Sequence, residues 1–206
     1  MKSKGFFLLL WGWVLALTLF PQISIAKTRI LIMGDSLTAG YGVNQDSAFP
    51  KQLENLLIKK KHNVQVIAAG SSGATSAGAT NRLRWHLKKK PDILILALGA
   101  NDGLRGLPVS STQKNLGEAI NLAKENKIKV LLAGMKMPTN YGQDYQNKYE
   151  KVFLDLSREK QITLIPFLLQ DVAVQKEYNL ADGIHPNEKG HLRIAENLMK
   201  FVEPAL

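Results

Sequence analysis

The chain has 206 residues, of which 45% are hydrophobic and 21% are charged, and its formal net charge is +10. These values are ordinary for a globular protein with one sizeable core, and they exclude a disordered or low-complexity chain. Because the sequence contains no cysteine, it also excludes disulfides, a thiol nucleophile and thiolate zinc sites.

The first residues have the pattern of a secretory signal. Two lysines precede an uncharged stretch over residues 6–20, and Ser24 and Ala26 are the small residues that a signal peptidase needs. The alternative is an uncleaved membrane anchor, but an apolar segment of 15 residues is short for crossing a bilayer. We therefore expect a signal peptide over residues 1–26 and a single domain over residues 27–206 that is periplasmic or secreted.

Five short apolar runs rich in β-branched residues follow along the chain. They cover residues 29–33, 64–68, 93–98, 128–133 and 162–167. Continuous apolar runs of this length are typical of strands buried on both faces. Helical patterns alternate with these runs to the end of the chain. The alternation predicts one α/β domain with a five-stranded parallel sheet and helices on both faces.

The helical patterns are recognised by apolar residues that share one helix face. Residues 77–90 form a less regular pattern with Leu83 and Leu87. The four regular faces are Phe49, Leu53, Leu56 and Leu57; Leu116, Ala119, Ile120 and Ala123; Tyr145, Tyr149, Val152, Phe153 and Leu156; and Leu192, Ala195, Leu198, Met199 and Val202.

Much of the positive charge lies in two lysine runs, at residues 59–61 and 88–90, each at the end of a predicted helix. Cations there complement the C-terminal end of the helix dipole, so a solvated helix end explains both runs. The runs leave weak attraction to anionic lipid open, whereas we expect no nucleic-acid partner.

Small and polar turn-forming residues follow four of the five predicted strands. They are residues 34–36 after the first strand, and residues 69–78, 98–103 and 180–190 after the second, third and last. Ligands of parallel sheets bind beyond the carboxyl ends of the strands. Ordinary turn chemistry explains any one of these loops. Together they predict a site at this edge of the sheet.

Of the four histidines, His185 has the setting best suited to catalysis. It lies in a loop three residues after Asp182, so a tight turn brings the carboxylate against one ring nitrogen while the other faces outward. Such a pair fixes the tautomer and stabilises the imidazolium formed during proton transfer. The same spacing also occurs in an ordinary turn before a helix, here with Asn187 as the cap. The other histidines are His62, expected to be solvated, and His86 and His191, which fall in helical patterns without an evident partner.

Ser36 is the candidate nucleophile. A serine hydroxyl needs an adjacent general base, and His185 is the only histidine predicted at the same sheet edge. The developing oxyanion needs hydrogen-bond donors, for which the backbone amides of Ser36 and Gly73 and the side chain of Asn101 are candidates. The alternatives are a helix N-cap for Ser36 and turns for Gly73 and Asn101.

Four stretches of the chain resemble, in family order, the sequence blocks of the SGNH (GDSL-type) hydrolases. They are GDSLTAGYG from Gly34, SSGATSAG from Ser71, GAND from Gly99 and DGIHP from Asp182. Within that family the chain is most similar to the bacterial periplasmic thioesterase, lysophospholipase and arylesterase branch. Thr38 and Ala100 depart from residues frequent in that branch, but neither carries a catalytic atom.

The resemblance implies a flavodoxin-like, three-layer α/β/α fold. It implies that Ser36 is the nucleophile, His185 the base and Asp182 its orienter. It also implies an oxyanion hole made by the amides of Ser36 and Gly73 and the side chain of Asn101. The expected enzyme is a serine esterase that hydrolyses small-molecule carboxylic esters and thioesters without a metal or cofactor.

The resemblance further implies an acyl pocket bordered by the loops at residues 106–112 and 135–145. Apolar residues in these loops suit a hydrocarbon chain, although loop packing explains them equally well. They are Leu107, Pro108, Met137, Pro138 and Tyr141.

Three other functions remain open. A carbohydrate O-deacetylase would use the same site, but few aromatic residues lie near the blocks to stack on sugar rings. A basic binding module with a decayed site is disfavoured by the complete set of catalytic residue types. A nucleotide-binding protein is disfavoured because neither glycine-rich phosphate motif appears at the first strand end.

Overall fold

The computed structural model describes residues 26–206, so the predicted signal peptide lies, apart from Ala26, outside the described residues. The chain alternates strands and helices from its first strand to its last helix. The strands are β1 Thr28–Gly34, β2 Val64–Gly70, β3 Ile93–Ala97, β4 Lys129–Ala133 and β5 Thr163–Ile165. The α-helices are α1 Ser36–Ala39, α2 Phe49–Lys59, α3 Ala79–His86, α4 Ala100–Leu104, α5 Val109–Glu125, α6 Gln143–Lys160 and α7 Glu188–Val202.

The five strands form one parallel sheet in the order β2-β1-β3-β4-β5. The predicted five-stranded parallel sheet is therefore confirmed, although β5 is shorter than the apolar run that predicted it. The chain goes outward from β1 to β2 in one direction and from β3 to β5 in the other. The topological switch point, where such sheets bind ligands, lies between β1 and β3.

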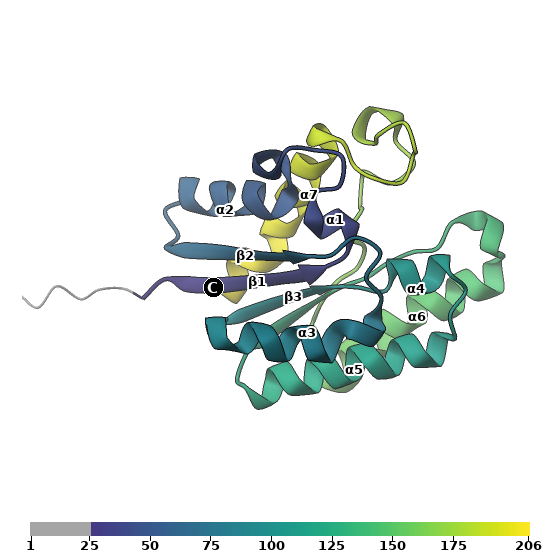
Figure 1. The fold of residues 1–206 in the computed structure, drawn as a ribbon, viewed down its shortest axis with the longest axis horizontal. Helices are drawn as coiled ribbons and strands as arrows, with labels where there is room; N and C mark the ends of the chain where they lie inside the picture. The colour runs from purple at the N-terminus through teal and green to yellow at the C-terminus, as the bar shows by residue number, and fades with distance from the viewer. Residues whose placement is uncertain (1–25) are drawn as a thin grey trace, which may run out of the picture.

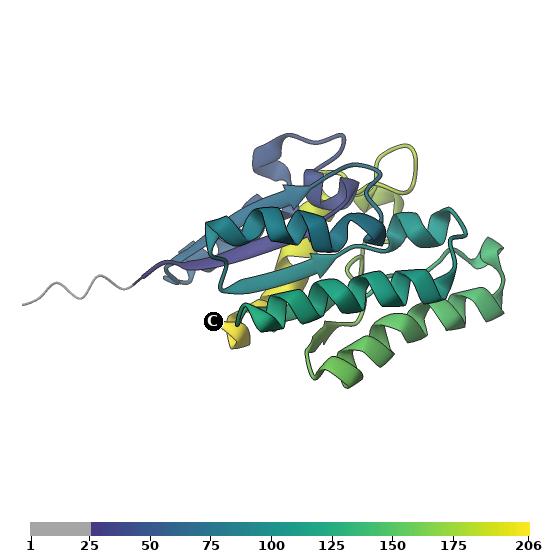
Figure 2. The ribbon, with the colours of Figure 1, turned by 60° about the horizontal axis from the view of Figure 1, so that its bottom comes forward.

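Helices cover both faces of the sheet. Helices α2 and α7 pack against each other on one face, and α3, α5 and α6 lie on the other (Figure 1). The view turned by 60° shows α3, α5 and α6 side by side across that second face (Figure 2). The predicted three-layer α/β/α arrangement is confirmed.

The central strands are buried on both faces. All residues of β3 are at most 2% exposed, and residues 30–33 of β1 are fully buried. Burial of this continuous apolar run is worth about 1.5–3 kcal/mol for each large side chain, which makes the sheet a rigid base for the loops at its edge.

Two predictions about the helix α7 region are wrong. Leu192 is 39% exposed, because the face of α7 that packs on the core runs from His191 through Ile194 and Ala195 to Leu198. His191 has a partner, since its Nδ1 accepts a hydrogen bond of 3.2 Å from the amide of Phe49.

His62 is also not simply solvated. Its Nε2 lies 3.1 Å from Oε1 of Glu203, and its side chain is about one-third exposed. The contact arises because the chain end after α7 returns to the end of α2, where Lys60 also pairs with Glu203.

Candidate active site

Ser36 is the first residue of α1, directly after the tight turn at the end of β1. Asp35, and not Ser36, is the N-cap of α1: its Oδ1 accepts a 3.0 Å hydrogen bond from the amide of Leu37. The alternative role of Ser36 as a helix cap is therefore wrong. Gly34 makes the turn possible, because a Cβ there would lie 2.0 Å from the hydroxyl oxygen of Thr38.

His185 and Asp182 lie in a loop that is closed at its base before α7. Asn179 pairs with Pro186 in an antiparallel bridge, and the amide of Leu180 donates to the carbonyl of His185. The tight turn expected around Asp182 and His185 is present, and the imidazole of His185 faces Ser36 at the end of β1.

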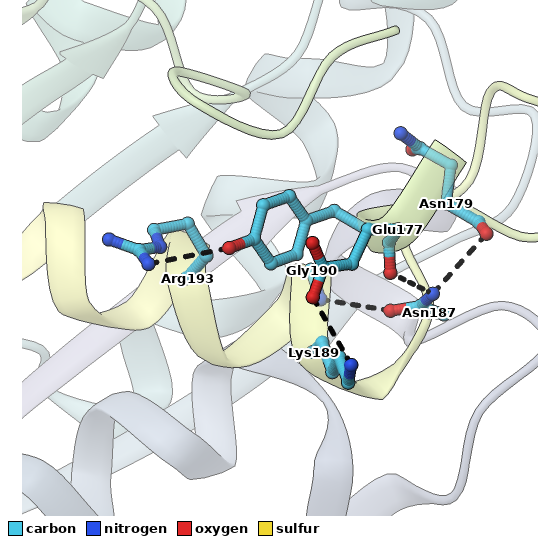
Figure 3. Close-up of polar contacts among 7 residues, drawn as sticks. Glu177, Asn179, Asn187, Lys189, Gly190 and Arg193 are labelled. Atoms are coloured by element: carbon cyan, nitrogen blue, oxygen red, sulfur yellow. Dashed lines mark hydrogen bonds and ion pairs between the residues drawn. The ribbon is translucent and has the colours of Figure 1, made fainter. Parts of the chain in front are cut away.

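Asn187 connects the base of this loop to α7 through hydrogen bonds (Figure 3). Its Oδ1 accepts from the amide of Gly190 and so caps α7, as predicted. Its Nδ2 donates to the carbonyls of Glu177 at 2.8 Å and Asn179 at 3.3 Å (Figure 3). The loop is therefore attached to a helix end rather than free to move independently.

The structure brings Ser36, His185 and Asp182 into one chain of hydrogen bonds. The Nε2 of His185 lies 3.0 Å from the Oγ of Ser36, and its Nδ1 lies 2.7 Å from Oδ2 of Asp182. The Oδ1 of Asp182 accepts from the amides of His185 and Ile184 at 3.0 and 2.9 Å. Together these hydrogen bonds lower the pKa of Asp182 to about 2. The largest effect comes from the amide of His185, followed by the amide of Ile184 and the side chain of His185. The carboxylate therefore stays charged beside the imidazole.

The ring of Tyr41 packs against the imidazole of His185, with ring centroids 4.5 Å apart. Tyr41 comes just after the end of α1, and its amide donates to the carbonyl of Ser36. The exposed ring of Tyr41 therefore borders the imidazole. The sequence analysis did not identify Tyr41 as part of the site. A tyrosine inside a glycine-rich loop after a candidate nucleophile was the available signal.

The three predicted oxyanion donors come from three neighbouring loops. Within residues 26–206, the backbone amides of Ser36 and Gly73 donate to no acceptor. Gly73 adopts φ +75°, which favours glycine. Asn101, after β3, directs its Nδ2 to the carbonyl of Ala74 at 3.1 Å and toward Oδ2 of Asp35 at 3.4 Å. Asn101 therefore bridges the loops that follow β1 and β2.

Asp35 is a completely buried acid beside Ser36. Burial raises its pKa to about 6, against the opposing effect of the amide of Leu37 and the charges of His185 and Arg82. Arg82, on α3, donates to the carbonyls of Gly34 at 2.9 Å and Ala69 at 2.5 Å. Its guanidinium thus joins the ends of β1 and β2. Sequence analysis missed both roles, because nothing local indicates which carbonyls Arg82 reaches.

The loops expected to border an acyl pocket lie next to α4. Met137 is buried, and its sulfur would lie 2.2 Å from a Cβ at Gly103, so it packs into the core. Leu107 is 36% exposed. Tyr141 donates its hydroxyl to the carbonyl of Leu104 at 2.8 Å. Loop packing therefore accounts for Met137 and Tyr141, and Leu107 remains available to solvent.

Across the described residues 26–206, no helix is both long and apolar enough to cross a membrane. In the same part of the chain, no group of three or more His, Cys, Asp or Glu side chains is placed to hold a metal ion.

Comparison with known proteins gives a consistent set of matches. Residues 32–193 match the GDSL-like Lipase/Acylhydrolase family. The chain is 34% identical to an arylesterase of Vibrio mimicus over 187 residues, which cover 89% of this chain and 94% of that protein. It is 32% identical to thioesterase 1/protease 1/lysophospholipase L1 of Escherichia coli, over 92% of this chain and 90% of that protein. Among solved structures, the crystal structure of TesA matches with a TM-score of 0.84 and 33% identity, over 87% of this chain and all of that chain.

Proposed function

This chain belongs to the GDSL-like lipase/acylhydrolase (SGNH) family of serine hydrolases, and on that premise we propose that it hydrolyses carboxylic esters and thioesters through an acyl-enzyme on Ser36. The observation that carries this mechanism is the hydrogen-bonded chain from Ser36 through His185 to Asp182. It lies at the switch point of the sheet, where α/β proteins of this topology bind ligands.

In the proposed reaction, the Oγ of Ser36 attacks the carbonyl carbon of the substrate while Nε2 of His185 takes the hydroxyl proton. The tetrahedral intermediate then collapses, and the imidazolium returns the proton to the leaving alcohol or thiol. Water next attacks the acyl-enzyme while His185 accepts one of its protons. Collapse of the second tetrahedral intermediate then breaks the bond to Ser36, whose Oγ takes that proton back from the imidazolium as the carboxylic acid leaves. The charged carboxylate of Asp182 stabilises the imidazolium in both halves.

The proposed oxyanion hole consists of the amides of Ser36 and Gly73 and the Nδ2 of Asn101. The loss of one such donor typically raises the barrier by about 3–4 kcal/mol. Support comes from the two unengaged amides. The carbonyl of Ala74 holds Asn101 in place through one hydrogen of Nδ2, and the other hydrogen, which makes the longer 3.4 Å contact to Asp35, would turn to the oxyanion when substrate binds.

The proposed substrates are small acyl esters and thioesters, in keeping with relatives named arylesterase and thioesterase/lysophospholipase. The test is a series of p-nitrophenyl esters and acyl thioesters from two to sixteen carbons, measured on the wild-type protein and on Ser36→Ala. Hydrolysis that requires Ser36 supports the proposal. Rates on the whole series that equal those of Ser36→Ala would reject it, and faster cleavage of acetylated sugars would instead favour an O-deacetylase.

We also propose export, with cleavage of residues 1–26 and a periplasmic or secreted product. Its support is the charged start, the uncharged stretch and the small residues before the expected cleavage site. Amino-terminal sequencing of the exported protein tests it: a start at Lys27 is expected, and an intact Met1 on the exported protein contradicts it.

Weak contact with anionic lipid is the remaining proposal about partners. Arg84 and the lysines at 88–90 are exposed, and Trp85 is 57% exposed with the Nζ of Lys88 3.8 Å from its ring. Clusters of basic residues attract anionic headgroups, and tryptophan favours the membrane interface. Sedimentation with anionic but not neutral vesicles is the expected result, and equal binding to both contradicts it.

A further inference from the structure

Two consecutive residues of helix α4 make hydrogen bonds to the loop that carries Gly73. Asn101 donates from Nδ2 to the carbonyl of Ala74 at 3.1 Å. Its neighbour Asp102 accepts two hydrogen bonds from Ser76, one from the amide at 2.8 Å and one from the hydroxyl at 2.5 Å. The loop from Gly73 to Ser76 is therefore hydrogen-bonded to α4 at two points, Ala74 and Ser76.

The Asp102 contact is almost completely buried. Asp102 is 2% exposed, Ser76 is 1% exposed and Thr112 is fully buried. The hydroxyl of Thr112 adds a longer bond of 3.4 Å to Asp102, and Nδ2 of Asn115 donates to the hydroxyl of Ser76 at 3.0 Å. The network thus ties the Gly73 loop, α4 and α5 together.

The carboxylate of Asp102 is held only by neutral donors. No lysine, arginine or histidine of residues 26–206 makes an ion pair with it. Burial of a carboxylate without a cation costs free energy, which the hydrogen bonds from Ser76 and Thr112 offset. The acid therefore fixes the position of Ser76 relative to α4, next to the proposed site.

We propose that Asp102 is a positioning residue for the oxyanion hole, and that through Ser76 it sets the separation between the Gly73 amide and the Asn101 side chain. The inference rests on the proposed function, because it acts through two of the proposed oxyanion donors. Donors stabilise developing charge only when they are held in place beforehand. A displacement of about 1 Å can reduce the rate by about 100-fold.

Asp102→Asn tests the proposal, because the amide keeps the volume but replaces one acceptor oxygen of the pair with a donor. With p-nitrophenyl butyrate, we expect kcat to fall by about 10- to 100-fold and KM to stay within about twofold. Thr112→Val is the matched control: it removes a bond to the same buried carboxylate but leaves both Ser76 contacts. We expect Thr112→Val to lower the melting temperature as much as Asp102→Asn does. Its kcat should stay within about twofold of the wild-type value.

Two further variants make the outcome decisive. Ser76→Ala retains the amide bond to Asp102 and loses the hydroxyl bond, so it should lower kcat by less, about 3- to 10-fold; it decides the question if Asp102→Asn does not fold. In an Asn101→Ala background, the effect of Asp102→Asn should shrink at least threefold, because one of the two positioned donors is already gone.

Three results would overturn the proposal. They are a folded Asp102→Asn protein with wild-type kcat, an equal loss of kcat in Thr112→Val, or an undiminished effect in the Asn101→Ala background. None of these touches the proposed function, which fails separately if the wild-type protein shows no hydrolysis that depends on Ser36.

Discussion

The imidazole of His185 and the hydroxyl of Ser36 lie 3.0 Å apart, although 149 residues separate them in the chain. The parallel sheet explains this proximity. Ser36 follows β1, the neighbour of the middle strand β3, and the loop of His185 crosses to the same carboxyl-terminal edge before α7 begins.

Ser36→Ala should lower kcat/KM for p-nitrophenyl butyrate by at least about 1,000-fold, because it removes the proposed nucleophile. The circular dichroism spectrum and melting temperature should not change, since Asp35 caps α1. Ser47→Ala, which removes a hydroxyl outside the site, serves as the control and should keep the wild-type rate. Retention of more than a few per cent of activity would reject Ser36 as the nucleophile.

Asp182→Asn should lower kcat by up to about 10,000-fold, because the amide no longer fixes the tautomer of His185 or stabilises its charged form. Steady-state kinetics on the same ester measures the effect. Glu177→Gln is the matched control, since it neutralises an exposed carboxylate in the preceding segment that pairs with Lys189. Equal losses in both variants would show that general charge, and not the contact with His185, is responsible.

Hydrolysis should fall as the solution is acidified from about pH 8 to about pH 4, because a protonated His185 cannot accept the proton of Ser36. The carboxylate of Asp182 does not cause this fall, since its pKa of about 2 keeps it charged throughout the range. Asp35, whose pKa is about 6, also gains a proton in this range, so the fall is measured on Asp35→Asn as well, where it should persist. A profile of kcat/KM against pH is the measurement. A flat profile over this range would contradict the role of His185 as general base.

Asp35→Asn should make the protein more stable above about pH 6. Burial raises the pKa of Asp35 from 3.8 to about 6, so the folded state binds its proton more tightly than the unfolded state. Stability is therefore lost as pH rises from about 4 to about 6, by up to about 3 kcal/mol, and the amide removes this loss. Urea unfolding at about pH 4 and pH 7.5 should show a difference only at the higher pH; equal differences at both would contradict this.

His191 should make the protein sensitive to acid. Burial lowers the pKa of His191 from 6.5 to about 4, with a smaller effect from the charge of His185. The folded state therefore resists protonation, and stability falls by about 3 kcal/mol as pH drops from about 6.5 through about 4. His191→Asn keeps an acceptor for the amide of Phe49 and should lose this part of the pH dependence. An unchanged slope of unfolding free energy against pH would refute the assignment.

The sequence predicted most of the fold, because its strands and helices are marked by local features. Five apolar runs marked the five strands. The length of the last run, at residues 162–167, was misleading, and the burial expected on both faces is wrong for the edge strands β2 and β5, which are partly exposed. Helix faces were read well where the period was regular. The error at Leu192 arose because α7 turns about 100° per residue, and its buried face begins at His191, a polar residue that an apolar pattern omits.

The candidate site was predicted from residue types at strand ends, and the structure places Ser36, Gly73, Asn101, Asp182 and His185 at one edge of the sheet. Sequence reasoning missed side chains that contact residues distant in the chain. Arg82 reaches two carbonyls on neighbouring strands, and Tyr41 packs on His185. Such contacts depend on how a helix or loop packs, and no spacing in the chain encodes them.

The amino-acid sequence by itself determined the order of strands and helices, the glycine-rich turn before Ser36 and the pairing of Asp182 with His185 three residues later, because each depends on neighbours in the chain. Only the tertiary structure decided that Asn101 bridges two loops and that Asp102 holds Ser76. These contacts join residues up to 66 positions apart. Their geometry follows from the packing of the sheet and its helices, which no short stretch of sequence specifies.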